Sequence, residues 1–533
     1  MAQDLASMAS IATELKYTPV DSIPAIASGV RNAFNSHKTK PIAFRLTQLR
    51  KLYWGIKDNE AAIVQACKED LGKSVFETYL SEIDWCTNDI VFVTQNLQKW
   101  MKDEKAPDIP LANKLLSPKI RKDPLGAILI IGTYNFPVNL CLTPLVGAIA
   151  AGCTAVLKPS ESAPSVAKIL QHIVETSIDA SCYTVVQGAV PETTALLEEK
   201  WDKIFYTGSA NVAKIIAKKA AETLTPMTLE LGGRNPAIVT KNANVRLAAK
   251  RLLWGKTLNA GQVCISQNYI MVDKEVLDPF IAEMKLALKQ FYPNGAKESD
   301  DFGRIVHGKQ WSRLKQMLES TRGRIVMGGD MDESQRYMGP TVIIVDSPSD
   351  PLVAEESFGP LIPILPVEDL DTAIRIAGEV HRTPLGLYPF GNKQETDRMM
   401  TETQSGGVSV NDALFHGSLS TLPFGGVGDS GHGAYRGKSS FDCFSHRRSV
   451  TSTPGWMEGL LDVRYPPYEG KLAKFKKMSE LKPNFDRDGK VKFSLWSYVL
   501  SLGTGSRTGG LVGYTVILLV AISSRQYLNN SGR

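Results

Sequence analysis

The stretch Pro124-Leu-Gly-Ala-Ile-Leu-Ile-Ile-Gly132-Thr-Tyr-Asn135-Phe-Pro137 decides the fold of this chain. Its unbroken apolar run between two glycines predicts a buried strand of the kind found in parallel sheets covered on both faces. The strand is expected to break at Gly132 into a loop that presents Asn135. A side-chain amide at a strand end is a good donor to an oxyanion. An asparagine before Phe-Pro is also common in turns. This segment alone therefore does not decide whether Asn135 binds an oxyanion or only forms a turn.

Short apolar runs separated by amphipathic stretches extend this pattern, at 127–132, 154–157, 183–186 and 203–206. The alternation predicts βαβ units and a parallel sheet. A second α/β region is expected from Thr228, with strand candidates at 237–239, 269–272 and 341–345. Residues 22–105 show the apolar spacing of helices instead. A single hydrophobic core stops growing at about 250 to 300 residues, so a chain of 533 residues is expected to form two large domains. With the alternating strand and helix patterns, the expected fold class is α/β.

Composition excludes several classes of protein. The net charge of +6 is spread along the chain, so no concentrated basic surface for nucleic acid is expected. Seven cysteines show no CxxC and no Cys/His pairs at ligand spacing, which predicts neither a metal site nor a disulfide framework. Residues 1–17 lack the charged start and apolar run of a secretory signal. The cytosolic face is the expected location.

Two further residues are candidates for chemistry. Glu230 lies between two leucines and is followed by Gly232-Gly233. Burial there would raise its pKa toward neutrality and suit a general base, although a surface glutamate near a turn is an equally good interpretation. Cys264 follows Gly261-Gln-Val, where the glycine would let backbone approach closely. A lone cysteine is more often a small buried apolar residue than a nucleophile, so its neighbours decide the matter.

Six motifs in order along the chain carry a resemblance to a known family. They are Lys158-Pro-Ser-Glu161, Phe205-Tyr-Thr-Gly-Ser209, Leu229-Glu-Leu-Gly-Gly233, Gly261-Gln-Val-Cys264, Glu355-Glu-Ser-Phe-Gly-Pro360 and Pro423-Phe-Gly-Gly-Val-Gly428. Together they resemble the aldehyde dehydrogenase superfamily over roughly residues 20–470. The segment 430–449 resembles the fatty aldehyde dehydrogenase branch in particular, which includes fungal apocarotenal dehydrogenases.

The resemblance implies the aldehyde dehydrogenase fold: a Rossmann-like cofactor domain, an α/β catalytic domain and a bridging β element. The tail sequence itself adds the expectation of a C-terminal membrane helix. The expected parts are a helical region with the NAD(P)-binding domain over 1–229, including a bridging strand near 114–123, a catalytic domain over 230–440, a bridging segment over 441–455, a gatekeeper tail over 456–507 and a membrane anchor over 508–524. Relatives pair through the bridging element, so a homodimer is expected.

The resemblance also assigns roles to residues. Cys264 is expected to attack the aldehyde as a thiolate, Asn135 and the Cys264 backbone N–H to hold the oxyanion, and Glu230 to activate water. The expected cofactor-binding residues are Lys158, Glu161, Thr207, Gly208, Ser209, Glu355 and Phe358. No metal ion is implied. Glu161 favours a free ribose hydroxyl over a phosphate, so NAD is the expected cofactor and NADP the alternative.

The C-terminal tail predicts a membrane partner. Residues 508–524 carry no charge, are rich in Val, Leu and Ile from 511 to 522, and lie between Arg507 and Arg525. As a helix they would extend roughly 25 Å, a little less than the roughly 30 Å hydrocarbon core. We therefore expect an anchor in membrane lipid that spans or inserts partway, with the catalytic part facing the cytosol. A buried core helix is the alternative interpretation.

The sequence as a whole predicts NAD(P)-dependent oxidation of a long apolar aldehyde to its acid through a cysteine thioester. The substrate could be an apocarotenal or a straight-chain fatty aldehyde, and the sequence leaves both open. A second hypothesis transfers the acyl group to coenzyme A, although Glu230 argues for water as the acceptor. A third is a membrane-bound scaffold that has lost catalysis, against which the intact set of Asn135, Glu230, Cys264 and Glu355 argues.

Overall fold

The computed structural model describes residues 14–481 and 483–491 of the 533-residue chain. The chain divides into two compact units. The first comprises residues 1–106 and 119–450, and the second comprises residues 107–118 and 451–533. All of the candidate site residues belong to the first unit.

The first sheet has the strand order β17-β7-β6-β3-β4-β5. Its strands are β3 (Ala127–Ile131), β4 (Thr154–Lys158), β5 (Tyr183–Val185), β6 (Lys203–Gly208), β7 (Met227–Leu231) and β17 (Gly431–His432). All pairs are parallel except β17 with β7. The chain runs outward from β3 to β5 and then returns to β6 on the other side of β3. The strand order therefore reverses between β3 and β6, where open α/β sheets bind their ligands.

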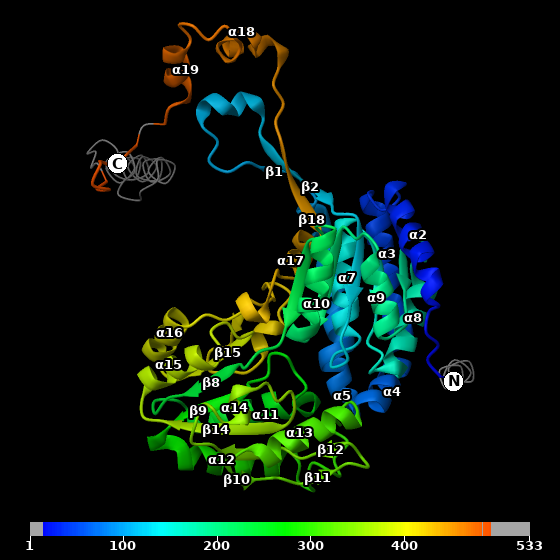
Figure 1. The fold of residues 1–533 in the computed structure, drawn as a ribbon, viewed down its shortest axis with the longest axis vertical. Coiled ribbons are helices and arrows are strands. Elements are labelled where there is room, and N and C mark those ends of the chain that lie inside the picture. The colour runs from blue at the N-terminus through cyan, green and yellow to red at the C-terminus, as the bar shows by residue number, and fades with distance from the viewer. Residues whose placement is uncertain (1–13, 482, 492–533) are drawn as a thin grey trace, which may run out of the picture. The chain divides into compact units, whose positions relative to one another are not determined.

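Helices cover both faces of this sheet (Figure 1), as the apolar run of β3 predicts. Ile128 and Ile130 pack into one core, together with α7 (Asn139–Ala151) and α8 (Pro164–Ser177). Ala127, Leu129 and Ile131 pack into another, together with α2 (Ile23–Asn35), α9 (Val190–Glu198) and α10 (Ala210–Glu222). Successive strand residues point to opposite faces, so a strand with helices on both sides is apolar throughout.

The predicted N-terminal helices are present. They are α2, α3 (Ile42–Asp58), α4 (Glu60–Leu71), α5 (Val75–Thr78), the π-helical turn η2 (Tyr79–Ile83) and α6 (Asp84–Trp100). Helices α3, α4 and α6 contribute Leu49, Ile63 and Ile90 to the core that contains α7 and α8. Helices α3, α4 and α6 therefore pack on the side of the first sheet that α7 and α8 cover.

The second sheet has the order β10-β13-β14-β9-β8-β15-β16, with only β10 antiparallel. Its strands are β8 (Pro236–Val239), β9 (Tyr269–Asp273), β10 (Arg324–Met327), β13 (Thr341–Ile344), β14 (Leu361–Val367), β15 (Gly386–Phe390) and β16 (Gly407–Val408). The helices of this region are α11 (Val245–Thr257), α12 (Leu277–Phe291), α13 (Gly308–Ser320), α14 (Pro351–Ala354), α15 (Leu370–Val380) and α16 (Lys393–Glu402). A hairpin, β11 (Met331–Asp332) with β12 (Tyr337–Met338), lies outside the sheet.

A small antiparallel sheet joins segments far apart in sequence. It contains β1 (Glu104–Lys105), β2 (Lys119–Pro124) and β18 (Ser445–Val450). The bridging strand was expected near 114–123, but it begins at Lys119, because residues 111–116 form the 3-10 helix η3 (Leu111–Leu116). The start of the expected 441–455 segment belongs to α17 (Gly437–Cys443). Pairing of this sheet with a second copy stays a prediction.

The second unit contains short helices among its described residues: η3, η8 (Gly455–Met457), α18 (Glu458–Leu461), η9 (Asp462–Arg464) and α19 (Leu472–Ser479). Within residues 14–481 and 483–491, no helix combines the length and the apolar character needed to cross a membrane. The expected anchor at 508–524 lies outside the described residues, as does the end of the expected gatekeeper tail.

Candidate active site

Asn135 lies in the loop that follows β3. The loop begins at Gly132, where a Cβ atom would clash with the sulfur of Cys141. Asn135 is buried, and its side-chain Nδ2 donates to the carbonyl oxygen of Gln262 at 3.0 Å. This bond fixes the amide and leaves its second N–H free to bind another acceptor.

Cys264 follows an unusual turn after α11. Asn259, Ala260 and Gly261 all have positive φ, of 50°, 51° and 74°. A Cβ on Gly261 would run into the backbone of Gly359, so only glycine fits there. After the cysteine, Asn235 Nδ2 donates to the carbonyl oxygens of Cys264 and Ser266, both at 2.8 Å. The backbone that carries the sulfur is therefore held on both sides.

Glu230 lies on β7, opposite Gly431 of β17. Gly431 has φ of 121°, and a Cβ atom there would clash with the Leu229 carbonyl. The glutamate is 3% exposed, and its two carboxyl oxygens are buried with no hydrogen-bond partner among the described residues. Burial raises the pKa of Glu230 well above its ordinary value. Once ionised, a carboxyl group with a raised pKa is a stronger base than an exposed one, which suits the removal of a proton from water.

The structure brings these three side chains to one cavity. Asn135, Glu230 and Cys264 all line a space of about 460 Å³ that begins at the carboxyl ends of β3, β6 and β7. Burial raises the pKa of the Cys264 thiol to about 12, and the neighbouring carboxylates of Glu356 and Glu230 add to the effect. The thiol is therefore protonated in this state of the protein, and a positive charge beside it would favour the thiolate.

The predicted cofactor residues divide into two groups. Thr207, Gly208, Ser209 and Phe358 line the same cavity as Cys264. Ser209 caps α10 by accepting from the Val212 N–H, so the N-terminus of that helix lies beside the cavity. The remaining residues do not line it.

Lys158 and Glu161 lie at the end of the neighbouring strand β4. Lys158 Nζ and Glu161 Oε2 form an ion pair at 2.7 Å, and the Gly132 N–H donates to the Lys158 carbonyl at 3.0 Å. The pair thus lies beside the start of the Asn135 loop, outside the residues that line the 460 Å³ cavity.

Glu355 was predicted to bind the cofactor, but the structure does not bring it to the cavity. Glu355 is exposed, whereas the next residue, Glu356, lines the cavity and accepts from the Gly233 N–H at 3.1 Å. A Cβ on Gly232 would lie within 2.5 Å of this carboxylate, so the carboxylate packs directly against the Gly232 backbone. Burial raises the pKa of Glu356 to about 7. We therefore replace Glu355 with Glu356 in the candidate site.

Cys264 also lines a second cavity of different character. This space of about 120 Å³ is walled almost wholly by apolar groups, among them Trp85, Phe136, Trp254 and Phe415. Phe415 is 55% exposed, so the cavity reaches the surface beside it. Cys264 therefore borders both this apolar cavity and the 460 Å³ cavity that carries the polar side chains, which we call the polar cavity.

The family model for the aldehyde dehydrogenase family matches residues 8–450. The chain belongs to this family. Beta-apo-4'-carotenal oxygenase of Neurospora crassa is 54% identical over 507 residues, covering 94% of this chain and 95% of the relative. The Gibberella fujikuroi protein of the same name is 47% identical, covering 95% of each chain. The solved substrate-bound structure of Staphylococcus aureus AldH is 40% identical with a TM-score of 0.82, covering 85% of this chain and 99% of that one.

Membership confirms the resemblance read from the motifs, and the protein is an aldehyde dehydrogenase. Sequence reasoning overlooked two residues of this aldehyde dehydrogenase's site. Asn235, which fixes the backbone around Cys264, lies two residues after the Leu231-Gly-Gly233 motif. Glu356 stood beside the chosen glutamate in a Glu-Glu pair. The sequence offered one signal for each of these residues. Asn235 lies just before the predicted strand at 237–239, and Glu356 is one of two adjacent glutamates, either of which could face the cavity.

Proposed function

We propose that this aldehyde dehydrogenase oxidises a long apolar aldehyde, an apocarotenal above all, to its carboxylic acid through a thioester on Cys264. The observation that carries the proposal is that Cys264 borders both the polar and the apolar cavity. An aldehyde whose carbonyl end enters the apolar cavity would present its carbonyl carbon to Cys264, with the rest of the chain extending past Phe415 toward the surface. The names of the two fungal relatives support an apocarotenal as substrate.

The residues of the polar cavity fit a nicotinamide dinucleotide. Thr207 Oγ1 is buried and has no hydrogen-bond partner among the residues that the structure describes. The α10 N-terminus and the Glu356 carboxylate border the same space. The cavity also lies at the strand-order reversal, where such cofactors bind. When bound, NAD or NADP accepts a hydride, and its positively charged ring favours the Cys264 thiolate. Glu161 beside Lys158 favours NAD, because a carboxylate repels a ribose phosphate.

The chain's own residues account for the remaining steps. The Cys264 thiolate adds to the aldehyde carbon, and the carbonyl oxygen becomes an oxyanion held by the free N–H of Asn135 and the Cys264 backbone N–H. Loss of hydride from that carbon leaves a thioester. Glu230 then takes a proton from water, the resulting hydroxide attacks the thioester carbon, and the acid leaves as the Cys264 sulfur departs. Because water is the acceptor that Glu230 can activate, the product is a free acid.

Chain-length dependence tests the substrate. With NAD in excess, kcat/KM is expected to rise as the aldehyde lengthens, by about fourfold per methylene buried, which corresponds to about 0.8 kcal/mol. Phe415→Asp should raise KM for hexadecanal and for an apocarotenal by at least about tenfold, because it places a charge at the cavity mouth, and leave propanal unchanged. Leu286→Asp, at an equally exposed position outside the cavity, is the matched control.

Competition between hexadecanal and an apocarotenal then decides the chain type, scored by the acid that each yields. Preference for the apocarotenal supports the proposal, and preference for hexadecanal makes the protein a general fatty aldehyde dehydrogenase. Equal kcat/KM for propanal and the long aldehydes would contradict both.

Residues 508–524 are proposed to anchor the protein to a membrane, and the uncharged, apolar sequence between Arg507 and Arg525 supports this. A chain truncated after Asp488 is expected to move from the membrane pellet to the supernatant on centrifugation, with unchanged kcat on propanal. Because long aldehydes partition into lipid, an anchored enzyme would meet them at high local concentration. Identical fractionation of the two chains would refute the anchor.

A further inference from the structure

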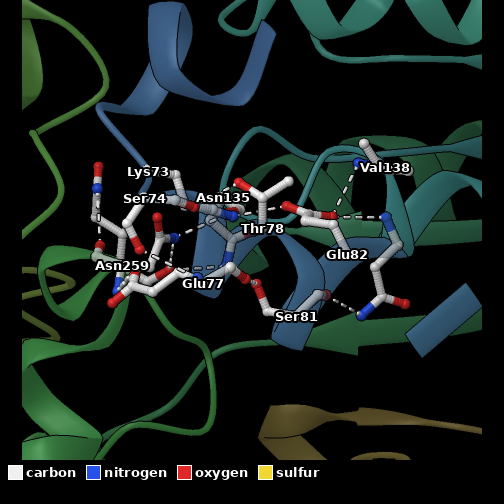
Figure 2. A network of polar contacts seen from close by, with 11 residues as sticks. Lys73, Ser74, Glu77, Thr78, Ser81, Glu82, Asn135, Val138 and Asn259 are labelled. Carbon is white, nitrogen blue, oxygen red and sulfur yellow. Dashed lines mark hydrogen bonds and ion pairs between the residues drawn. The ribbon is translucent and has the colours of Figure 1, made fainter. Parts of the chain in front are cut away.

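A buried ion pair that lines neither cavity contacts the segment 132–138, which we call the Asn135 loop. Lys73 and Glu82 have fully buried side chains, and Lys73 Nζ lies 2.6 Å from Glu82 Oε1. Figure 2 shows the pair between the short helical turns α5 and η2, residues 75–83, and the chain around Asn135 and Val138. Burying two charges is costly unless each gains strong hydrogen bonds. Their other partners therefore indicate what the pair does.

Lys73 uses its remaining contacts on the Asn135 loop. Its Nζ donates to the Asn135 carbonyl oxygen at 3.1 Å and lies 4.5 Å from the centre of the Phe136 ring. Glu82 acts on the other end of that loop, because its Oε2 accepts from the N–H groups of Val138 and Asn139 at 3.2 and 2.8 Å. These N–H groups begin α7, where a carboxylate is favourable. One ion pair thus holds residues 135–139 at both ends.

The same short segment also holds the turn that leads to Cys264. Glu77 Oε2 accepts from the Asn259 N–H at 3.1 Å, at the first residue of the left-handed run. Two consecutive non-glycine residues in that conformation are strained and need outside support. Asn259 Nδ2 in turn donates to the Asn135 carbonyl at 2.8 Å and to the Gln262 carbonyl at 3.1 Å. The Asn135 and Cys264 loops therefore meet at one carbonyl oxygen, which Lys73 and Asn259 share (Figure 2).

We propose that Lys73, Glu77 and Glu82 are positioning residues that set the Asn135 amide at the distance from the Cys264 sulfur that oxyanion binding needs. The inference rests on the proposed oxyanion role of Asn135. Lys73 and Glu82 act through the Asn135 loop, and Glu77 acts through the Asn259 turn. None of the three lines either cavity, so each affects the reaction only through the residues that it holds.

A double-mutant cycle on kcat tests this role. The variant Lys73→Met/Glu82→Gln removes both charges of the pair together, so neither partner is left behind as an unpaired buried charge. It is expected to lower kcat on propanal by about 10- to 100-fold, since displacements near 1 Å have such effects, with little change in KM. Asn135→Ala alone should lower kcat by about 10²- to 10³-fold. In the Asn135→Ala background the charge-pair variant should have almost no further effect.

Lys203→Met is the matched control. Lys203 is also a buried lysine, and it donates to the Cys443 carbonyl at 2.9 Å near the Phe444 ring, but it lies at the amino end of β6. Its loss should leave kcat unchanged. If the charge-pair variant fails to fold, Asn259→Gly provides the same test, because glycine tolerates the left-handed position and removes the second donor to the Asn135 carbonyl.

The outcomes separate the two hypotheses. If Asn135→Ala keeps full kcat, the oxyanion role fails, and the positioning role fails with it. If Asn135→Ala lowers kcat but the charge-pair variant lowers it by the same factor in both backgrounds, only the positioning role fails. A charge-pair variant with full kcat also overturns the positioning role and leaves the proposed function intact.

Discussion

Cys264→Ser is expected to lower kcat by at least about a thousandfold, because a serine hydroxyl is a far weaker nucleophile than a thiolate. Among the described residues, no histidine lines the 460 Å³ cavity to activate the hydroxyl. The measurement is the absorbance of reduced cofactor with a long-chain aldehyde as substrate. Binding of the cofactor should be retained, because none of the groups proposed to hold it changes.

The matched control is Cys443→Ser. Cys443 is partly buried like Cys264, and it lines neither of the two cavities. Its sulfur lies 3.3 Å from Thr228 Oγ1, a contact that a hydroxyl can keep. This variant should retain full kcat. Retained turnover in Cys264→Ser would refute the thioester mechanism, whatever the control shows.

Glu230→Gln is expected to trap the acyl-enzyme. Glutamine keeps the shape of the side chain but cannot accept a proton from water, so thioester hydrolysis should slow by about 10²- to 10⁴-fold while its formation continues. The expected result is a burst of one reduced cofactor per active site, followed by a slow steady rate. Mass spectrometry should find one acyl group on Cys264.

The rate of thioester hydrolysis is expected to depend on pH through Glu230. The pKa of Glu230 is raised by burial, so its basic form becomes populated only as the pH rises through that raised value. Hydrolysis by the unaltered protein should therefore accelerate with increasing pH, and Glu230→Gln should lose this dependence. Glu222→Gln, at an exposed position on α10, should behave like the unaltered protein. A variant that shows no burst and no acyl adduct would place Glu230 in an earlier step.

Strands with continuous apolar runs could be predicted from the sequence. Residues 127–132 and 154–157 were predicted as strands, and the structure has β3 at Ala127–Ile131 and β4 at Thr154–Lys158. Strands of two residues, such as β16 and β17, have no periodicity to detect. The 229/230 boundary was also set from motifs alone, and it falls inside β7.

The site was predictable where one residue type stood in a distinctive motif, as for Asn135, Glu230 and Cys264. The choice between Glu355 and Glu356 was not, because only the backbone direction after α14 decides which carboxylate faces the cavity. Lys73 and Glu82 gave no signal either. Charged residues in amphipathic helices are usually exposed, and the burial of this pair depends on contacts with residues 135–139, far along the chain.

Strand β17 gives the protein a constraint during its synthesis. The edge of the first sheet beside Glu230 is completed only by Gly431 and His432, which the ribosome adds some 200 residues after β7. A nascent chain can assemble β3 to β7 early, yet it keeps the β7 backbone as an open edge until most of translation is complete. Open edges pair with other chains, so we expect the β7 edge to be accessible to such pairing until residue 432 has emerged.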